Sequence, residues 1–332
     1  LSVPPSRLWS VAQGTGVVLT LVLVSALVLA PAVALGVLWD MVIPLLPAVF
    51  LINPMLWRNV CPLATLNQVG GTRAERKLKG GALDGGWAVG IILLVLMVPA
   101  RRFLFNEQGA VLAGTIVAVA LLALGAGLLF SRRAGFCNSI CPVLPVEKLY
   151  GQHPLIAVPS AVCPDCNGCA AKGCVDLTAG RSMDQSVGRG HEGWRWLRTP
   201  MGGFAALFPG FVIGYFTTVN GSLSTAPAVY GHVALWMIGS GAVVAALVLA
   251  FRLSTAVALP LLGILALGLY YWYAAPGLAE AYGFPELGPA VVRGTAFLLI
   301  TTWLIRAVPQ LRATAAATSH TLPPVPGALL FI

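Results

Sequence analysis

Four cysteines stand close together in the middle of this chain, at Cys163, Cys166, Cys169 and Cys174. Their spacing is C-x2-C-x2-C-x4-C. Thiolates that are separated by two residues on a tight loop can converge on a single soft-metal centre, because sulfur is a soft ligand. The run therefore indicates that metal binding is the chemistry of this part of the chain.

The spacing is close to the pattern that holds a [4Fe–4S] cluster in bacterial ferredoxins, C-x2-C-x2-C-x3-C-P. It differs in the last gap, which is one residue longer, and Val175 stands where that pattern has proline. A structural zinc site also uses four cysteines, but usually as two C-x2-C pairs with a longer stretch between them. The run favours an iron–sulfur cluster, with zinc as the alternative.

Two further interpretations of the same cysteines are disfavoured. Disulfides need an oxidising compartment, and the chain has seven cysteines, an odd number. Unliganded cysteines of a hydrophobic core would not stand beside polar residues such as Asp165, Asn167 and Lys172.

The other three cysteines belong to two similar motifs that lie 80 residues apart. Cys61 and Cys141 each follow an apolar run and each precede a proline. Cys137 lies four residues before Cys141, whereas Trp57 occupies the same position before Cys61. Because the following proline biases a residue away from helix, each cysteine is expected at a helix-terminating turn. The repetition predicts a duplicated two-span unit, with Cys61, Cys137 and Cys141 together on one membrane face.

Seven cysteines are one short of two all-cysteine [4Fe–4S] clusters. In two-cluster ferredoxins the fourth cysteine of a run ligates the other cluster. Cys174 can therefore complete its own run or complete the set of Cys61, Cys137 and Cys141, and each arrangement leaves one site with three thiolates. His153 and His191 are candidates for a missing ligand, although both also fit a surface position. A single cluster with three unused thiols is the remaining possibility.

The composition is that of an integral membrane protein. Of the 332 residues, 58% are hydrophobic and only 9% are charged, and the mean hydropathy is +0.87. Soluble domains carry about 25% charged residues. The net charge of +9 fits the basic loops of a membrane protein. The chain has no basic run interleaved with aromatic residues, which is the pattern that would suggest binding of nucleic acid. Nucleic acid is therefore excluded as a partner, and membrane lipid is the first partner expected.

Eight apolar runs predict about eight transmembrane helices and an all-α fold. The second run is broken by prolines and fits either a kinked span or a re-entrant segment. The runs delimit N-terminal membrane helices (1–130), an iron–sulfur segment (131–199), C-terminal membrane helices (200–310) and a tail (311–332). They are 14–38, 41–57, 86–100, 110–130, 202–219, 229–251, 256–275 and 290–305.

The basic residues predict the orientation of these spans. With eight crossings and a cytoplasmic N-terminus, 17 of the 20 Lys and Arg residues fall on the cytoplasmic side. Only Arg101, Arg102 and Arg293 fall outside, where Asp40 and Glu107 also lie. All seven cysteines are then cytoplasmic, where thiols stay reduced.

Paired C-x3-C-P motifs beside membrane spans, together with ferredoxin-type cysteines, resemble the membrane polyferredoxin family. That family includes quinol dehydrogenase subunits of periplasmic nitrate reduction, membrane regulators of nitrous oxide reductase and assembly proteins of copper-containing oxidases. The resemblance covers roughly residues 40–180. Cys137 and Cys141 match one motif fully, and Cys61 matches half of the other. The family usually carries two ferredoxin motifs where this chain has one, and the spans after residue 200 have no counterpart.

The resemblance implies a multi-pass protein of the bacterial inner membrane with a cytoplasmic, ferredoxin-like iron–sulfur segment. It implies one or two [4Fe–4S] clusters that pass electrons between the quinone pool and a partner protein. Two alternatives are a metal-reducing assembly factor for a copper or haem enzyme, and a structural or electron-transfer subunit of a larger respiratory or photosynthetic complex. Whether the protein is itself an enzyme, as a quinol dehydrogenase would be, stays open.

Overall fold

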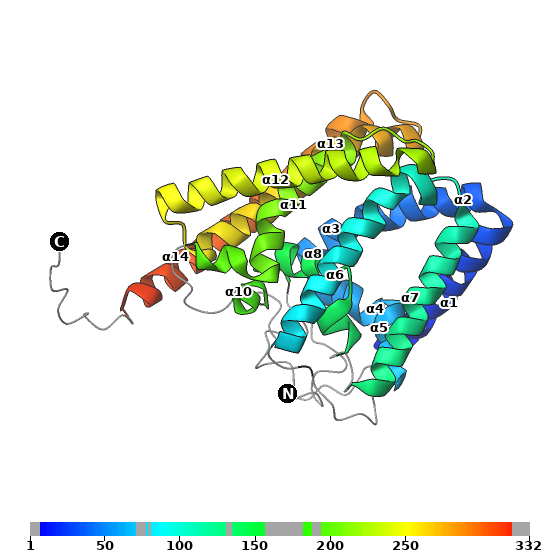
Figure 1. Ribbon diagram of the computed structural model, residues 1–332, viewed down its shortest axis with the longest axis horizontal. Coiled ribbons are helices and arrows are strands. Elements are labelled where there is room, and N and C mark those ends of the chain that lie inside the picture. The colour runs from blue at the N-terminus through cyan, green and yellow to red at the C-terminus, as the bar shows by residue number, and fades with distance from the viewer. Residues whose placement is uncertain are drawn as a thin grey trace.

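The computed structural model describes residues 7–70, 78, 81–130, 135–156, 182–187 and 194–320. All regular elements in these ranges are helices, which confirms the expected all-α class (Figure 1). In chain order they are α1 (Arg7–Leu29), α2 (Pro31–Gly36), the π-helical turn η1 (Val37–Val42), α3 (Ile43–Ile52), α4 (Pro54–Val60), α5 (Pro62–Gly70), α6 (Gly81–Ala100), the π-helical turn η2 (Arg101–Phe105), α7 (Gly109–Leu129), the π-helical turn η4 (Phe136–Ile140), α8 (Leu144–Tyr150), α10 (Ser182–Val187), the 3-10 turn η8 (Arg195–Arg198), α11 (Pro200–Phe216), the 3-10 turn η9 (Leu223–Thr225), α12 (Ala226–Phe251), α13 (Thr255–Ala281) and α14 (Gly288–His320).

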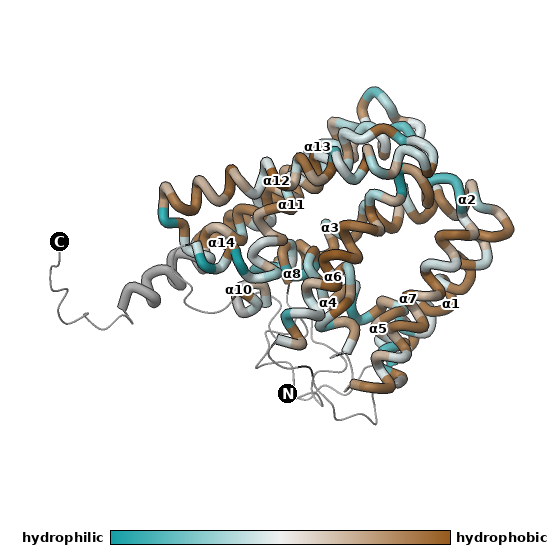
Figure 2. The backbone as a smooth tube through the Cα atoms, in the orientation of Figure 1, coloured by the Kyte–Doolittle hydropathy of each residue, from teal (hydrophilic) through white to brown (hydrophobic). Residues whose placement is uncertain are grey.

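Seven helical segments in the described ranges are long and apolar enough to cross a membrane, so the chain is a multi-pass membrane protein. The apolar stretches cover most of each helix in Figure 2. The expected span around 202–219 corresponds to α11, which is apolar but has only 17 residues. The seven are Arg7–Leu29, Pro31–Ile52, Gly81–Phe105, Gly109–Leu129, Leu223–Phe251, Thr255–Ala281 and Gly288–Val308.

The boundary between the first two spans lies earlier in the chain than the apolar runs 14–38 and 41–57 predict. The break lies at Ala30, whose φ of −142° and ψ of 62° are not helical, and the next helix begins at Pro31. Proline disfavours helical backbone in the residue before it, which explains the position of the break. The second span then runs without interruption to Ile52 and includes Asp40, which the sequence had suggested would lie between spans.

Two tyrosines, Tyr271 of α13 and Tyr282 directly after it, form hydrogen bonds with the backbone of the second span near its prolines. Pro44 has no N–H to offer to the carbonyl of Asp40, and the Tyr282 hydroxyl donates to that carbonyl at 3.0 Å. One turn later, the Tyr271 hydroxyl accepts from the Ala48 N–H at 3.0 Å and donates to the Pro44 carbonyl at 2.8 Å. Tyr271 thus forms a bridge between α3 and α13.

The helices form two groups joined by short central elements. In Figure 1, α1 and α7 lie side by side at one end, and α11, α12, α13 and α14 lie together at the other. Helices α3, α4, α6 and α8 lie between them. The largest core cluster belongs to the second group and the central elements, and includes the fully buried Trp196, Trp303 and Phe50.

Contacts between helix ends define one side of the molecule, which we call the cysteine side. It contains residues 53–70 and 135–156. The Asn67 amide donates to the Ala123 carbonyl at 2.8 Å, which places the end of α7 here. The Trp303 indole of α14 donates to the Gln152 carbonyl at 2.8 Å, and Arg306 donates to the Leu155 carbonyl.

The opposite side contains the turns between α6 and α7, between α11 and α12, and between α13 and α14. The Gly221 N–H donates to the Arg102 carbonyl at 2.8 Å, and the Arg102 guanidinium donates to Asn220 at 3.0 Å. The ends of the helices in the described part of the chain thus gather on two opposite sides, while the predicted count of eight crossings stays a prediction because seven segments are long enough to span.

Replacement of Tyr271 by Phe should destabilise the protein by about 1–3 kcal/mol, because the Ala48 N–H and the Pro44 carbonyl would lose their partner. Thermal unfolding in detergent measures this. Tyr273→Phe is the matched control, since Tyr273 lies in the same helix and is 36% exposed. Equal melting temperatures for the two variants would show that the Tyr271 bridge contributes nothing.

Candidate metal centre

The structure describes three of the seven cysteines. Cys61, Cys137 and Cys141 are placed, whereas Cys163, Cys166, Cys169 and Cys174 lie outside the described residues, as does His191. The site is therefore built from the two short cysteine motifs, and the four-residue run remains a sequence prediction.

Cys61 and Cys141 adopt the same backbone conformation, as the duplicated motif predicts. Cys61 ends α4 with φ −59° and ψ 123°, and Cys141 ends η4 with φ −62° and ψ 122°. The Cys61 N–H donates a hydrogen bond to the Trp57 carbonyl at 2.8 Å, and the Cys141 N–H donates to the Phe136 carbonyl at 3.0 Å. Each bond is the last one of the preceding helix. The prediction of two helix-terminating turns is confirmed.

The three cysteines also lie together, which confirms that Cys61 and Cys141 share one membrane face. They belong to one hydrophobic cluster with Phe136 and the small side chains Ala64, Ala123 and Ala126. Even so, no three ligand side chains within the described ranges are placed to hold a metal ion. The short motifs by themselves therefore gather thiols without forming a complete ligand set.

Burial keeps the Cys61 and Cys141 thiols protonated at neutral pH. It raises the pKa of Cys61 to about 12, and the neighbouring Cys137 adds to the effect. It also raises the pKa of Cys141 to about 12, with further contributions from the charge of Glu147 and from Cys61. Because only thiolates ligate metals, binding here would displace protons, and a metal's positive charge would offset the cost.

Glycines of the membrane helices allow both cysteine turns to approach closely. A Cβ atom on Gly16 of α1 would lie 2.4 Å from the Val60 carbonyl oxygen, next to Cys61. A Cβ atom on Gly90 of α6 would lie 3.0 Å from the carbonyl oxygen of Cys141. Each turn thus lies against the backbone of a different span.

Arg58 connects the two motifs. It lies in the first motif, three residues before Cys61, and its guanidinium donates to the Cys137 carbonyl at 2.6 Å and to the Asn138 side chain at 2.7 Å. It also lies 4.0 Å from the Glu147 carboxylate of α8. Arg58 is 2% exposed and Glu147 is 4% exposed, so the ion pair is almost fully removed from water.

A second buried cation, Lys148, links three more elements. Its ammonium donates to the Ser186 hydroxyl of α10 and lies 4.4 Å above the Trp87 ring of α6. The Trp87 indole in turn donates to the Asn138 carbonyl at 3.0 Å. Two buried cations therefore flank the second cysteine motif, and cations of this kind stabilise negative charge in a site of low dielectric.

Sequence reasoning had counted Arg58 and Lys148 among the basic residues of aqueous loops, and both are instead buried. The sequence contains a signal for the burial of Arg58, because Arg58 lies inside the Trp57–Cys61 motif rather than in the loop that follows.

Trp57 itself packs against the main core rather than in the cysteine cluster. His153 has a φ of 51° and packs its ring edge-on against Trp303, at a centroid distance of 6.1 Å.

Both ends of the segment that carries the four-cysteine run are fixed beside α8. Before it, the Ile156 N–H donates to the Ile52 carbonyl at 3.1 Å, and the Asn53 amide donates to the Ile156 carbonyl. After it, α10 begins at Ser182 and buries Met183 and Val187 completely. Cys163 is the seventh residue after Ile156, and an extended chain of that length spans at most about 25 Å.

Arg58→Met should destabilise the protein by about 3–5 kcal/mol, because it removes the guanidinium from beside the buried Glu147 carboxylate. The double variant with Glu147→Met should recover part of this loss. Arg195→Met is the control, since Arg195 is exposed. The measurement is thermal unfolding in detergent, and equal effects of Arg58→Met and Arg195→Met would contradict the role given to Arg58.

Comparisons with family models, with curated proteins and with solved structures find no match for this chain.

Proposed function

We propose that the protein is a membrane-bound iron–sulfur electron carrier. One observation carries the proposal: the thiols of two separate motifs lie in one cluster, on the side where the chain enters and leaves the segment with the C-x2-C-x2-C-x4-C run. In this proposal Cys163, Cys166, Cys169 and Cys174 hold one [4Fe–4S] cluster. Cys61, Cys137 and Cys141 provide ligands for a second, with Cys174 or a non-cysteine group as the fourth.

The donor set and its surroundings fit such a group. Thiolates are the usual ligands of iron–sulfur clusters, and charge, burial and hydrogen bonds set the potential. Arg58 would hold the Cys137 turn in place and, with Lys148, would favour the negatively charged thiolate form of the site. The cluster supplies the redox chemistry, whereas these residues bind, orient and shield it.

Membrane quinone is the proposed redox partner within the bilayer. A cavity of about 600 Å³ lies between α3, α13 and α14 and opens among exposed side chains such as Leu45 and Val291. Its lining is apolar except for a few groups, among them the Asp40 carboxylate and Thr295, and this combination suits a lipophilic ligand with a polar head. The cysteine side faces the cytoplasm of a bacterial inner membrane in this proposal, in agreement with the distribution of basic residues.

Anaerobically purified protein should contain iron and acid-labile sulfide and give an EPR signal on reduction, because the run suits a cubane cluster. Metal and sulfide analysis with EPR spectroscopy measures this directly. Stoichiometric zinc without iron would overturn the proposal.

Cys166→Ala should remove the [4Fe–4S] cluster that the four-cysteine run is proposed to hold. Cys141→Ala should affect only the second cluster, which is proposed to be bound by Cys61, Cys137 and Cys141. Both effects are read as iron per protein. Ser139→Ala is the control, because Ser139 lies between Cys137 and Cys141 and its hydroxyl donates to the Gly135 carbonyl. An unchanged iron content in Cys166→Ala would contradict the assignment of the run.

Addition of a quinol to the oxidised protein in lipid nanodiscs should bleach the cluster absorbance. If the cluster is present but no quinol reduces it, the assembly-factor function or the subunit function replaces the proposed circuit. Loss of metal from a copper or haem enzyme after deletion of the gene would support the assembly factor. Strict co-purification with a larger complex would support the subunit.

A further inference from the structure

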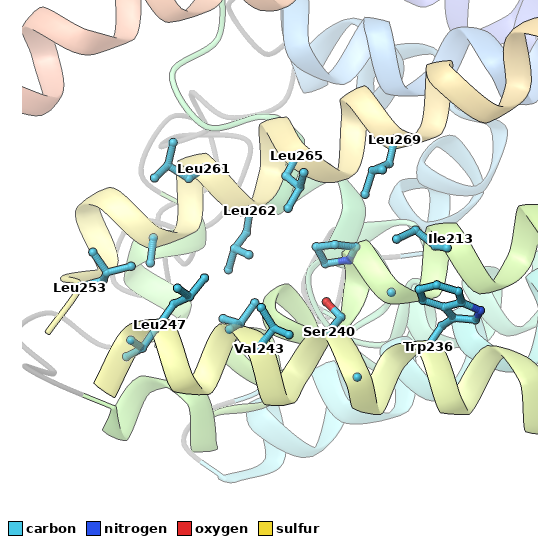
Figure 3. A pocket seen from close by; sticks show the side chains of 16 residues that line it. Ile213, Trp236, Ser240, Val243, Leu247, Leu253, Leu261, Leu262, Leu265 and Leu269 are labelled. Atoms are coloured by element: carbon cyan, nitrogen blue, oxygen red, sulfur yellow. The ribbon is translucent and has the colours of Figure 1, made fainter. Parts of the chain in front are cut away.

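A long groove separates α12 from α13 on the surface of the membrane region. It encloses about 600 Å³ and is lined by the side chains that Figure 3 shows, with Leu262 of α13 facing Val243 of α12. Leu253 and Leu247 lie at one end, and Trp236 lies toward the other (Figure 3). The only hydroxyl in the lining is that of Ser240, and it donates to the Ala206 carbonyl at 2.9 Å. Apart from the indole nitrogen of Trp236, the groove therefore offers almost entirely hydrocarbon surface.

Helix α11 forms the floor of the groove and keeps its walls apart. At Gly210 a Cβ atom would lie 2.0 Å from the Trp236 carbonyl oxygen, so the backbones of α11 and α12 are in direct contact. Helix α13 packs against another part of α11. Helices α12 and α13 are thus each held by contacts with α11 rather than by contacts with each other. The space between them is therefore a consequence of how these three helices pack.

The dimensions of the groove match a lipid chain. From Ala258 to Leu269 the α13 wall extends roughly 17 Å, at 1.5 Å per residue. The hydrocarbon depth of one leaflet is about 15 Å, half of a typical bilayer core. Branched side chains cover most of the walls, whereas closely packed transmembrane helices usually meet through small residues. The lining therefore favours a flexible hydrocarbon chain over a partner helix.

Arg252 stands at the mouth of the groove on the cysteine side. It follows α12 directly, precedes the lining residue Leu253 and is exposed. Within the described part of the chain its guanidinium makes no ion pair or hydrogen bond. Its backbone is left-handed, with φ 50° and ψ 42°, a conformation that glycine adopts without strain. A cation is thus held at a strained turn, next to the lining residue Leu253 at one end of the groove.

We propose that this groove binds an anionic phospholipid, with one acyl chain between α12 and α13 and the phosphate at Arg252. A headgroup phosphate is the complementary charge at that depth, and anionic lipids are bound by basic residues near the membrane surface. The site is separate from the cysteine motifs and does not depend on the proposed electron transfer.

The test uses the full-length protein in nanodiscs of mixed phosphatidylglycerol and phosphatidylcholine, followed by native mass spectrometry. Wild-type protein should retain phosphatidylglycerol preferentially. Arg252→Gln should lower that preference about fivefold, the effect of one basic residue near a membrane surface. Arg293→Gln, which removes an arginine from the opposite side where it stacks on Trp272, should leave the preference unchanged.

A second pair of variants tests the groove itself. Val243→Trp should fill it and reduce lipid retention with Arg252 intact. Leu249→Trp is the matched control, because both side chains are 60% exposed on α12 and only Val243 lines the groove. Equal retention of both lipids by the wild type, or full retention by Val243→Trp or by Arg252→Gln, would overturn the proposal. A photoreactive residue at position 243 that cross-links to a polypeptide would also overturn it.

Discussion

The buried guanidinium of Arg58 is the interaction on which the cysteine side depends. It belongs to the first motif but donates its hydrogen bonds to the second, and the Glu147 carboxylate of α8 lies beside it. An arginine that is removed from water must be compensated by acceptors and by opposite charge, so it fixes the positions of the groups that surround it. The duplicated turns are consequently held in one relative arrangement, and the thiols of the two motifs lie in one cluster.

The second span shows how the membrane constrains backbone hydrogen bonding. Prolines remove donors from this helix, and no water is present in the bilayer core to replace them. Tyr282, which follows α13, donates its hydroxyl to the Asp40 carbonyl that Pro44 leaves without a donor. Tyr271 of α13 also bonds to the Ala48 N–H and the Pro44 carbonyl, so both tyrosines attach the second span to this part of the chain. Because the same span leads through Asn53 into α4 and Cys61, its attachment to α13 also fixes the position of the first cysteine turn.

Buried charges and neutral thiols lie close together on the cysteine side. Burial holds the pKa of Cys61 and of Cys141 near 12, so the thiols stay neutral in the absence of a metal. Arg58 and Lys148 are buried within the same region and are anchored by Asn138, Trp87 and Ser186. In the proposed function these two cations would offset part of the negative charge of thiolate ligands, whereas the Glu147 carboxylate would oppose it.

The sequence by itself determined the class of the protein and the local conformation at its cysteines. Its composition predicted the membrane helices, because few charged residues can be accommodated in a bilayer, and each proline predicted the turn at the cysteine before it. The sequence did not determine the division of the first two spans at Ala30, since apolar composition continues through that break. Only the tertiary structure shows that Arg58 and Lys148 are buried and that Tyr271 forms hydrogen bonds with the backbone of α3. Each of these depends on contacts between residues far apart in the chain, and neither periodicity nor composition encodes such contacts.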